Sequence, residues 1–190
     1  MHRFATSITR VLVTASVLLP LSPARAEEKK SEAVGPDRAA MIAAARELIG
    51  SQTFCALITL DESGRPQVRT MNPFPPEEDM TVYMATSTRS LKYQQIQRDP
   101  RVTVYYSDHM KGNGYAALTG RAVLVDDPDE IKKRKRAYWD QTFDPGLKNL
   151  VLIKVVPERL ELVVYNKPGL AQDKNTWRPP AIELGPTAKK

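Results

Sequence analysis

Short runs of β-branched and aromatic residues, separated by turn residues, dominate much of the chain. Such runs predict strands, because these side chains pack well on a pleated surface. The runs at 53–60 and 67–71 flank Asp61-Glu62-Ser63-Gly64, a pattern that predicts a hairpin. Gly120 predicts a bulge or bend within its strand. The remaining predicted strands are 81–86, 101–107, 115–125, 150–156 and 160–165.

Capping residues predict three helices between these strands. Asp37 begins one helix, which ends at Gly50, and a short helix at 90–98 stops before Asp99-Pro100. Asp127 and Pro128 begin a third, which carries the basic run at 132–136 and ends at Tyr138-Trp139. Strands joined by hairpins, with only interspersed helices, predict a mainly β (α+β) domain. We expect an antiparallel, barrel-like sheet with a few short flanking helices.

The first 26 residues have the pattern of a secretory signal peptide. Arg3 and Arg10 precede or flank a short apolar run at 11–21, and Ala24-Arg25-Ala26 is a small-x-small cleavage site. The run is too short to span a bilayer, although an N-terminal anchor or a core helix remains the alternative. We therefore expect export, to a periplasmic or secreted location, with no stable membrane span after cleavage.

The remaining sequence predicts one folded unit between two less structured segments. Residues 27–36 are predicted to be a flexible tether, 37–166 the folded domain and 167–190 a Pro-rich coil tail. The chain has a net charge of +6, but residues 1–26 hold three arginines and no acid, so the rest carries only +3. That excess is too small to predict nucleic-acid binding, and the basic run at 132–136 is interpreted as a solvated helix face.

The usual catalytic side chains are scarce after residue 26. Cys55 lies in an apolar strand and is interpreted as a buried hydrophobe, and His109 lies in a polar turn. One cysteine and one histidine make neither a disulfide nor a Cys/His zinc set, and a serine triad would require His109. These absences favour a binding protein or a cofactor-dependent enzyme.

One loop concentrates anion-binding groups at the start of the predicted helix 90–98. It holds four hydroxyls and two cations, from Thr86, Ser87, Thr88, Ser90, Arg89 and Lys92. A helix N-terminus presents unpaired N–H groups and a partial positive charge, so these side chains predict a phosphate site. Arg69, in the preceding strand, could reach the same space. An ordinary helix cap is the alternative, but a cap needs only one hydroxyl.

The order of these segments resembles the pyridoxamine 5'-phosphate oxidase-like superfamily of FMN-binding split barrels, including its general stress protein 26-type members. The resemblance rests on an arginine in a hairpin strand, then a strand, Thr-Ser-x-x-Ser-x-Lys, a helix and Asp-Pro-Arg-Val before another strand. It extends through Leu118–Ala122, Asp126-Asp127 and Leu152–Glu161, and covers residues 37–165.

The resemblance implies a split β-barrel that binds flavin mononucleotide (FMN) and forms a homodimer with flavin sites at the subunit interface. It implies a flavin-dependent oxidoreductase that acts on a small molecule. The sequence does not identify a catalytic residue, and we expect no metal site. The phosphate would be held by Arg69, Ser90 and Lys92, with Ser87 as a helper. The ring would meet the backbone of Thr70 and Met71, beside Ala85 and Thr86.

Two features depart from the family pattern and leave alternatives open. True pyridoxamine 5'-phosphate oxidases carry Arg-Leu-x-Pro near the C-terminus, whereas this chain has Trp177-Arg178-Pro179-Pro180, so that particular activity is in doubt. The expected signal peptide is also unusual for the family. A non-enzymatic flavin or haem module remains possible, with His109 as the one available axial ligand, as does a deazaflavin-dependent reductase.

Overall fold

The computed structural model describes residues 37–185 of the 190-residue chain. The predicted signal peptide (1–26) and tether (27–36) lie outside the described residues. Within the described part, no helix has the length and apolar character needed to cross a membrane.

Within residues 37–185, four short helices flank the sheet, and three of them begin at the caps that the sequence indicates. The side chain of Asp37 accepts a hydrogen bond from the Ala39 amide at 3.0 Å, and Asp127 accepts one from Asp129 at 2.8 Å. Ser90 caps the second helix. The helices are α1 (Arg38–Gly50), α2 (Leu91–Arg98), α3 (Pro128–Lys133) and α4 (Trp139–Thr142), followed by the 3-10 turn η1 (Pro145–Leu147).

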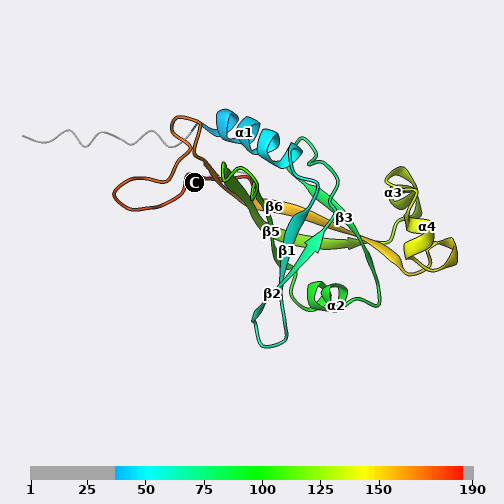
Figure 1. Cartoon of the computed structure of the whole chain (residues 1–190). Helices are drawn as coiled ribbons and strands as arrows, with labels where there is room; N and C mark the ends of the chain where they lie inside the picture. The colour runs from blue at the N-terminus through cyan, green and yellow to red at the C-terminus, as the bar shows by residue number, and fades with distance from the viewer. Residues whose placement is uncertain (1–36, 186–190) are drawn as a thin grey trace, which may run out of the picture. The chain divides into compact units, whose positions relative to one another are not determined.

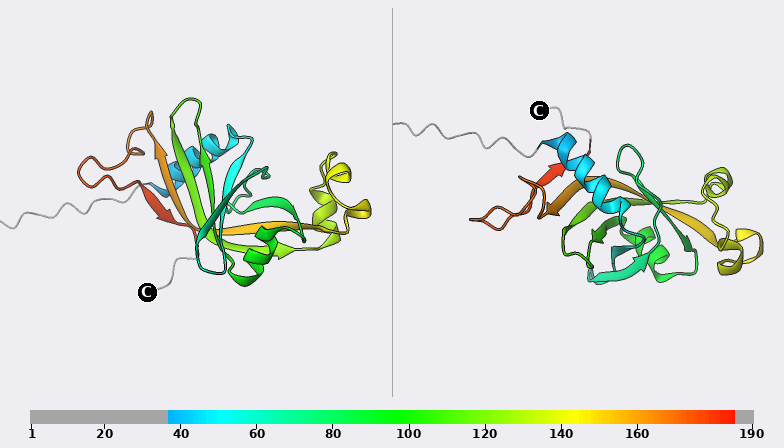
Figure 2. Two further views of the ribbon diagram at one scale, coloured as in Figure 1. Left: turned by 60° about the horizontal axis from the view of Figure 1, so that its bottom comes forward. Right: turned by 45° about the horizontal axis from the view of Figure 1, so that its top comes forward.

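The strands form one antiparallel sheet in the order β2-β1-β4-β5-β6-β3, with β7 paired to β6 (Figures 1 and 2). They are β1 (Cys55–Leu60), β2 (Pro66–Met71), β3 (Val82–Ser87), β4 (Arg101–Ser107), β5 (Gly114–Val125), β6 (Leu150–Val164) and β7 (Ala181–Glu183). This confirms the predicted α+β class. Consecutive strands β2 and β3 stand at opposite ends of the path, so the sheet opens between them.

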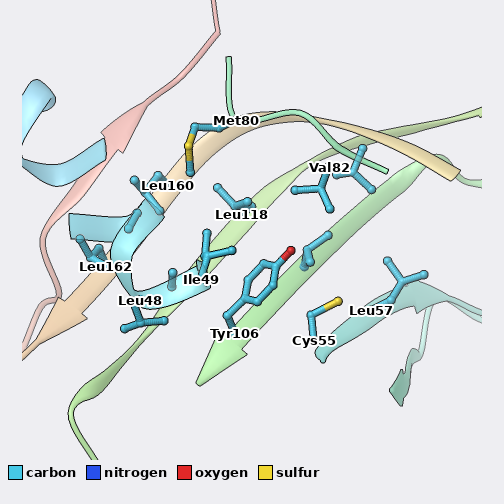
Figure 3. Packing of buried hydrophobic residues seen from close by; sticks show 14 of the residues in the cluster. Leu48, Ile49, Cys55, Leu57, Met80, Val82, Tyr106, Leu118, Leu160 and Leu162 are labelled. Carbon is cyan, nitrogen blue, oxygen red and sulfur yellow. The ribbon is translucent and has the colours of Figure 1, made fainter. Parts of the chain in front are cut away.

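The inward face of this sheet forms the main core. Burial alternates along β1 and β4, and Leu57, Val104 and Leu118 are fully buried. Helix α1 packs against β4, β5 and β6 and adds residues such as Leu48 to this cluster, as Figure 3 shows. Cys55 is buried in the same core, as predicted, and burial raises the pKa of its thiol to about 12.

Strand β6 corrects one prediction, because 150–156 and 160–165 are a single strand. The Pro157 break does not end pairing: the register shifts between Thr119 and Gly120, and Pro157 is placed opposite Gly120. Glu158 is left without a partner on β5, and its carbonyl instead accepts hydrogen bonds from residues after β7. A bulge therefore accommodates the proline.

Two further segments differ from the prediction. The helix that begins at Asp127 ends at Lys133, and a separate short helix, α4, carries Trp139. The segment predicted as coil from residue 167 contains β7. We call residues 126–149, which connect β5 to β6, the arm; Figure 1 shows α3 and α4 beside the end of the sheet away from α1.

The arm is held by a second hydrophobic cluster on the outer face of β3, β5 and β6. Trp139 is 1% exposed and packs with Tyr83 and Leu152. Partly buried residues from the arm and the loop after β2 complete this cluster, among them Phe74, Ile131 and Phe143. The arm is therefore a packed part of the domain.

Candidate functional site

A pocket of about 310 Å³ lies where β2 and β3 end, between the start of α2 and the arm. None of its lining residues in the described structure is acidic, and Lys92 is the one lining residue that carries a full charge. The lining is Thr70, Met71, Asn72, Ala85, Thr86, Ser87, Ser90, Lys92, Tyr138, Trp139, Thr142 and Phe143.

Edge strands give this pocket exposed backbone. β2 pairs only with β1, and β3 pairs only with β6. The unpaired edge of a strand presents N–H and C=O groups that can bind a ligand. The opening of the sheet therefore places main-chain donors and acceptors from β2 next to the pocket.

The hydroxyl groups gather at the N-terminus of α2. The Ser90 side chain accepts from the Tyr93 amide at 3.3 Å, and its oxygen lies 3.0 Å from Thr86 Oγ1. Ser87 Oγ accepts from the Arg89 amide at 3.1 Å. Ser90 thus serves as the helix cap, while the pocket lining also includes Thr86 and Ser87, so the hydroxyls exceed what capping needs.

Two cations meet beside this helix terminus. Burial lowers the pKa of Lys92, and the neighbouring charge of Arg69 lowers it further. Neither side chain forms a salt bridge with any carboxylate in the described part of the chain. Two close cations without a carboxylate repel each other, and an anion bound between them would remove that repulsion.

Arg69 is held in place by two buried polar residues. Its guanidinium donates to Thr59 Oγ1 and, at 3.0 Å, to Gln95 Oε1. Thr59 is fully buried and donates to the same Gln95 oxygen at 2.6 Å. Burial lowers the pKa of Arg69, but the group stays charged. This fixed network holds a positive charge that acts on Lys92 from outside the pocket lining.

Arg89 does not join the site. Its guanidinium forms a salt bridge with Asp144 in the arm, and the side chain is 69% exposed. The sequence placed Arg89 among the cations at the start of the helix, but the structure directs it to the solvent side. Lys92 and Arg69 are the cations that remain for an anion.

The arm supplies an aromatic wall opposite the strands. The rings of Trp139 and Phe143 meet edge to face at 6.1 Å, and Trp139 meets Phe74 in the same way at 6.1 Å. Tyr138 and Thr142 complete this wall. These edge-to-face rings give the pocket an apolar wall, against which a planar ring system can pack.

Two arginines fasten the arm to the loop after β2. Arg136 donates to the carbonyl of Pro73 at 2.7 Å and to that of Asn72 at 3.3 Å. Arg134, only 8% exposed, binds Glu77 at 2.6 Å and stacks over a tyrosine ring. Two members of the basic run at 132–136 are therefore structural, which corrects its interpretation as a solvated face.

Comparison with known proteins identifies the family. The family model for pyridoxamine 5'-phosphate oxidase matches residues 41–164. The chain belongs to this family. It is 29% identical over 108 residues to general stress protein 26 of Bacillus subtilis, which covers 54% of this chain and 74% of that protein.

Two solved structures show the same fold. A pyridoxamine 5'-phosphate oxidase-related, FMN-binding protein from Nostoc punctiforme is 18% identical, with a TM-score of 0.52, covering 81% of this chain and 99% of that one. A heme-binding protein from Mycobacterium smegmatis is 17% identical, with a TM-score of 0.51, covering 65% of this chain and 54% of that one. The oxidase-like fold is thus associated with two different cofactors.

Most of the site residues expected from the family resemblance lie together. Seven of them line the one pocket: Thr70, Met71, Ala85, Thr86, Ser87, Ser90 and Lys92. Arg69 does not line it, although its charge acts on Lys92. His109 and Trp177 are exposed and do not line it either. In the described part of this oxidase-family chain, no cluster of acidic, histidine or cysteine side chains could hold a metal ion.

Sequence analysis did not identify the residues that support the oxidase-like site from outside the pocket lining. Thr59 is a single polar residue in an apolar strand, and Gln95 is one of several polar residues in a short helix, so neither residue carried a signal. The sequence showed Trp139 at the end of a predicted helix but did not show where it lies relative to the cofactor. The arm wall could have been suspected from the spacing of Tyr138, Trp139 and Phe143, but only the folded arm shows which side of the pocket they form.

Proposed function

We propose that this protein binds FMN and acts as a flavin-dependent oxidoreductase on a small molecule. The observation that carries the proposal is that Lys92 lines the pocket together with hydroxyls at the N-terminus of α2. Arg69 adds a second positive charge nearby, and neither cation forms a salt bridge with a carboxylate among residues 37–185. A phosphate group fits there, because it would receive charge-assisted hydrogen bonds from side chains and approach a helix N-terminus.

The remainder of the pocket suits the flavin ring. The unpaired edge of β2 at Thr70 and Met71 offers backbone groups to the polar edge of the ring, and Trp139 and Phe143 offer an apolar wall. When bound, the flavin would supply hydride or single-electron transfer, and the protein would bind and orient it. The chain itself would supply fixed polar groups around Lys92 for the phosphate, and the apolar side chains of Trp139 and Phe143 would exclude water from the ring.

The proposal includes a homodimer. A cavity of 310 Å³ is at the small end for a cofactor with its substrate. Apolar side chains also stand on the outer face of the sheet near the pocket: Val68, two residues before Thr70, is 65% exposed, and Phe54 is 57% exposed. A second copy on this face would cover them and enlarge the site.

We propose export to the periplasm or the medium, because residues 1–26 have the sequence pattern of a secretory signal peptide. An exported flavoprotein would gain its cofactor after leaving the cytoplasm if it travels unfolded. The substrate and its electron donor would then be those of an extracytoplasmic compartment.

Haem is the second candidate ligand, because one relative of the same fold is a heme-binding protein. The pocket does not favour haem, because it offers no histidine as an axial ligand. His109, the one histidine among residues 37–185, is exposed and outside the lining. A deazaflavin has a phosphate as well and would use the same cations.

The decisive experiment is titration of the purified protein with FMN, riboflavin and haem, followed by absorbance and fluorescence. We expect FMN to bind more tightly than riboflavin, because only FMN carries the phosphate. Tighter binding of haem than of FMN, or equal affinities for FMN and riboflavin, would overturn the proposal. Light scattering of the loaded protein would then give its oligomeric state.

A further inference from the structure

Tyr138 is the one acidic hydroxyl in the pocket. It is the N-cap residue of α4, lines the pocket with Asn72 and Lys92, and its side chain is 44% exposed. It therefore contacts both the pocket and the solvent. A phenol in that position can transfer a proton inward and recover one from water.

One hydrogen-bond donor lies beside the phenolic oxygen. Arg136 Nη1 is 3.5 Å from Tyr138 Oη. Asn72 lines the same pocket, and the buried indole N–H of Trp139 has no hydrogen-bond partner among the described residues. The positive charge of Arg136 favours a negative charge on the phenolic oxygen.

Arg136 is held rigidly in this role. Its bonds to the carbonyls of Asn72 and Pro73 and its position 4.1 Å over the Phe74 ring leave the guanidinium little freedom. Burial alone would raise the pKa of Tyr138, but the Arg136 guanidinium, with smaller contributions from the neighbouring Trp139 and Asn72 side chains, brings it below its usual value.

The other charged groups near Tyr138 do not oppose this effect. Lys92 lines the same pocket and is positive. Asp140, two residues further along α4, is paired with Lys135 at 2.8 Å. No carboxylate among the described residues lines the pocket, so the charges that face the phenol are positive.

We propose that Tyr138 is the proton donor of this pocket, acting on a conjugated carbonyl compound, and that Arg136 is its positioning residue. The proposal rests on the proposed flavin function. A planar conjugated carbonyl compound can stack on the free face of a flavin ring held by this wall and accept a hydrogen bond from a phenol. The chemical class is therefore a quinone or an enone.

The proton balance of the step is simple. A flavin held in this pocket and reduced beforehand by a nicotinamide donor would supply the hydride, which would form a bond with the second carbonyl oxygen of a quinone or with the β-carbon of an enone. The O–H bond of Tyr138 breaks, and its proton forms a new bond with the substrate at the carbonyl oxygen of a quinone, or at the α-carbon of an enone. The phenolate that remains faces Arg136 and is reprotonated by water at its exposed side.

The first test uses the cofactor-free protein, so it does not depend on flavin binding. Tyrosinate absorbance is titrated with base in the wild type and in Tyr138→Phe, Tyr165→Phe and Arg136→Gln. Tyr165 is the matched control, an exposed tyrosine outside the pocket. We expect the earliest ionisation to vanish only in Tyr138→Phe and to move to higher pH in Arg136→Gln. An unchanged titration in Tyr138→Phe would overturn the proposal.

The second test measures transfer. FMN-loaded protein is reduced with dithionite without oxygen, and its reoxidation by menadione and by cyclohexenone is followed across pH. General acid catalysis predicts a loss of about tenfold or more in Tyr138→Phe, measured with both proteins saturated with FMN. The wild-type rate should fall as pH rises through the pKa of Tyr138, and the variant should lack that fall.

The outcomes separate the two proposals. Equal rates in wild type and Tyr138→Phe, or the same basic fall in both, would overturn the role of Tyr138 while FMN binding stands. Failure of the protein to bind FMN would overturn the proposed function, yet the cofactor-free titration would still test the interaction between Tyr138 and Arg136.

Discussion

Replacing Lys92 with alanine tests the phosphate site directly. A charge-assisted hydrogen bond contributes about 1.5–3 kcal/mol, so Lys92→Ala should weaken FMN binding by that amount. The loss corresponds to roughly ten- to a hundredfold in the dissociation constant. Riboflavin lacks the phosphate, and its affinity should barely change. Both ligands are titrated into wild type and variant, and quenching of flavin fluorescence gives the two dissociation constants.

The free protein should respond to Lys92→Ala in the opposite direction. Because burial and Arg69 lower the pKa of Lys92, its charge is unfavourable in the folded apoprotein, and its loss should leave thermal stability equal or higher. Lys111→Ala, an exposed lysine in the turn after β4, is the control for the loss of one charge. Equal losses of FMN and riboflavin affinity, or no loss of either, would refute the phosphate assignment and leave the loop as a helix cap.

Three more predictions follow from the same structure. FMN affinity should fall below about pH 6, where the phosphate loses its second charge, and again at alkaline pH as Lys92, with its lowered pKa, loses its proton; riboflavin binding should show neither change. Gly120→Ala should cost about 1–3 kcal/mol in urea unfolding, because the new Cβ would lie 2.2 Å from the Val156 carbonyl oxygen, whereas Gly50→Ala, with open space around it, should not. Intact-mass measurement of the exported protein should give Glu27 as the first residue, and a retained 1–26 segment would indicate an anchor instead.

The elements that could be predicted are those whose signals are local. Strand β4 was placed at its observed bounds, because Val102, Val104 and Tyr106 alternate with less buried residues and Asp99-Pro100 ends the preceding helix. The loop before α2 is also contiguous, so its residues necessarily meet at one helix terminus. Most of the pocket lining could be expected for this reason, once the family resemblance added the strand that carries Thr70.

Pro157 shows where local signals mislead. A proline lacks the N–H that a strand ladder uses, so it correctly indicates that regular pairing stops. It does not indicate whether the partner strand can adapt. Gly120 lies opposite and has no Cβ, which lets the backbones approach closely while Glu158 bulges out. The strand continues because of a residue almost forty positions away, a relation that local pattern analysis cannot supply.

The arm has a consequence for how this protein selects its ligand. Its basic run has the composition of a solvated face, yet Arg134 and Arg136 turn inward because acidic and carbonyl acceptors on the loop after β2 lie within reach. By binding that loop, they fix the wall that faces the strand edges. The loop before α2 is built from neighbouring residues, whereas the ring end depends on a contact between distant segments. The same arm also holds that loop, because Asn149 donates to Ser87 Oγ at 3.2 Å and Asp144 pairs with Arg89. A change in the arm should therefore alter both ends of the pocket, because one segment positions the aromatic wall and the hydroxyls at the start of α2.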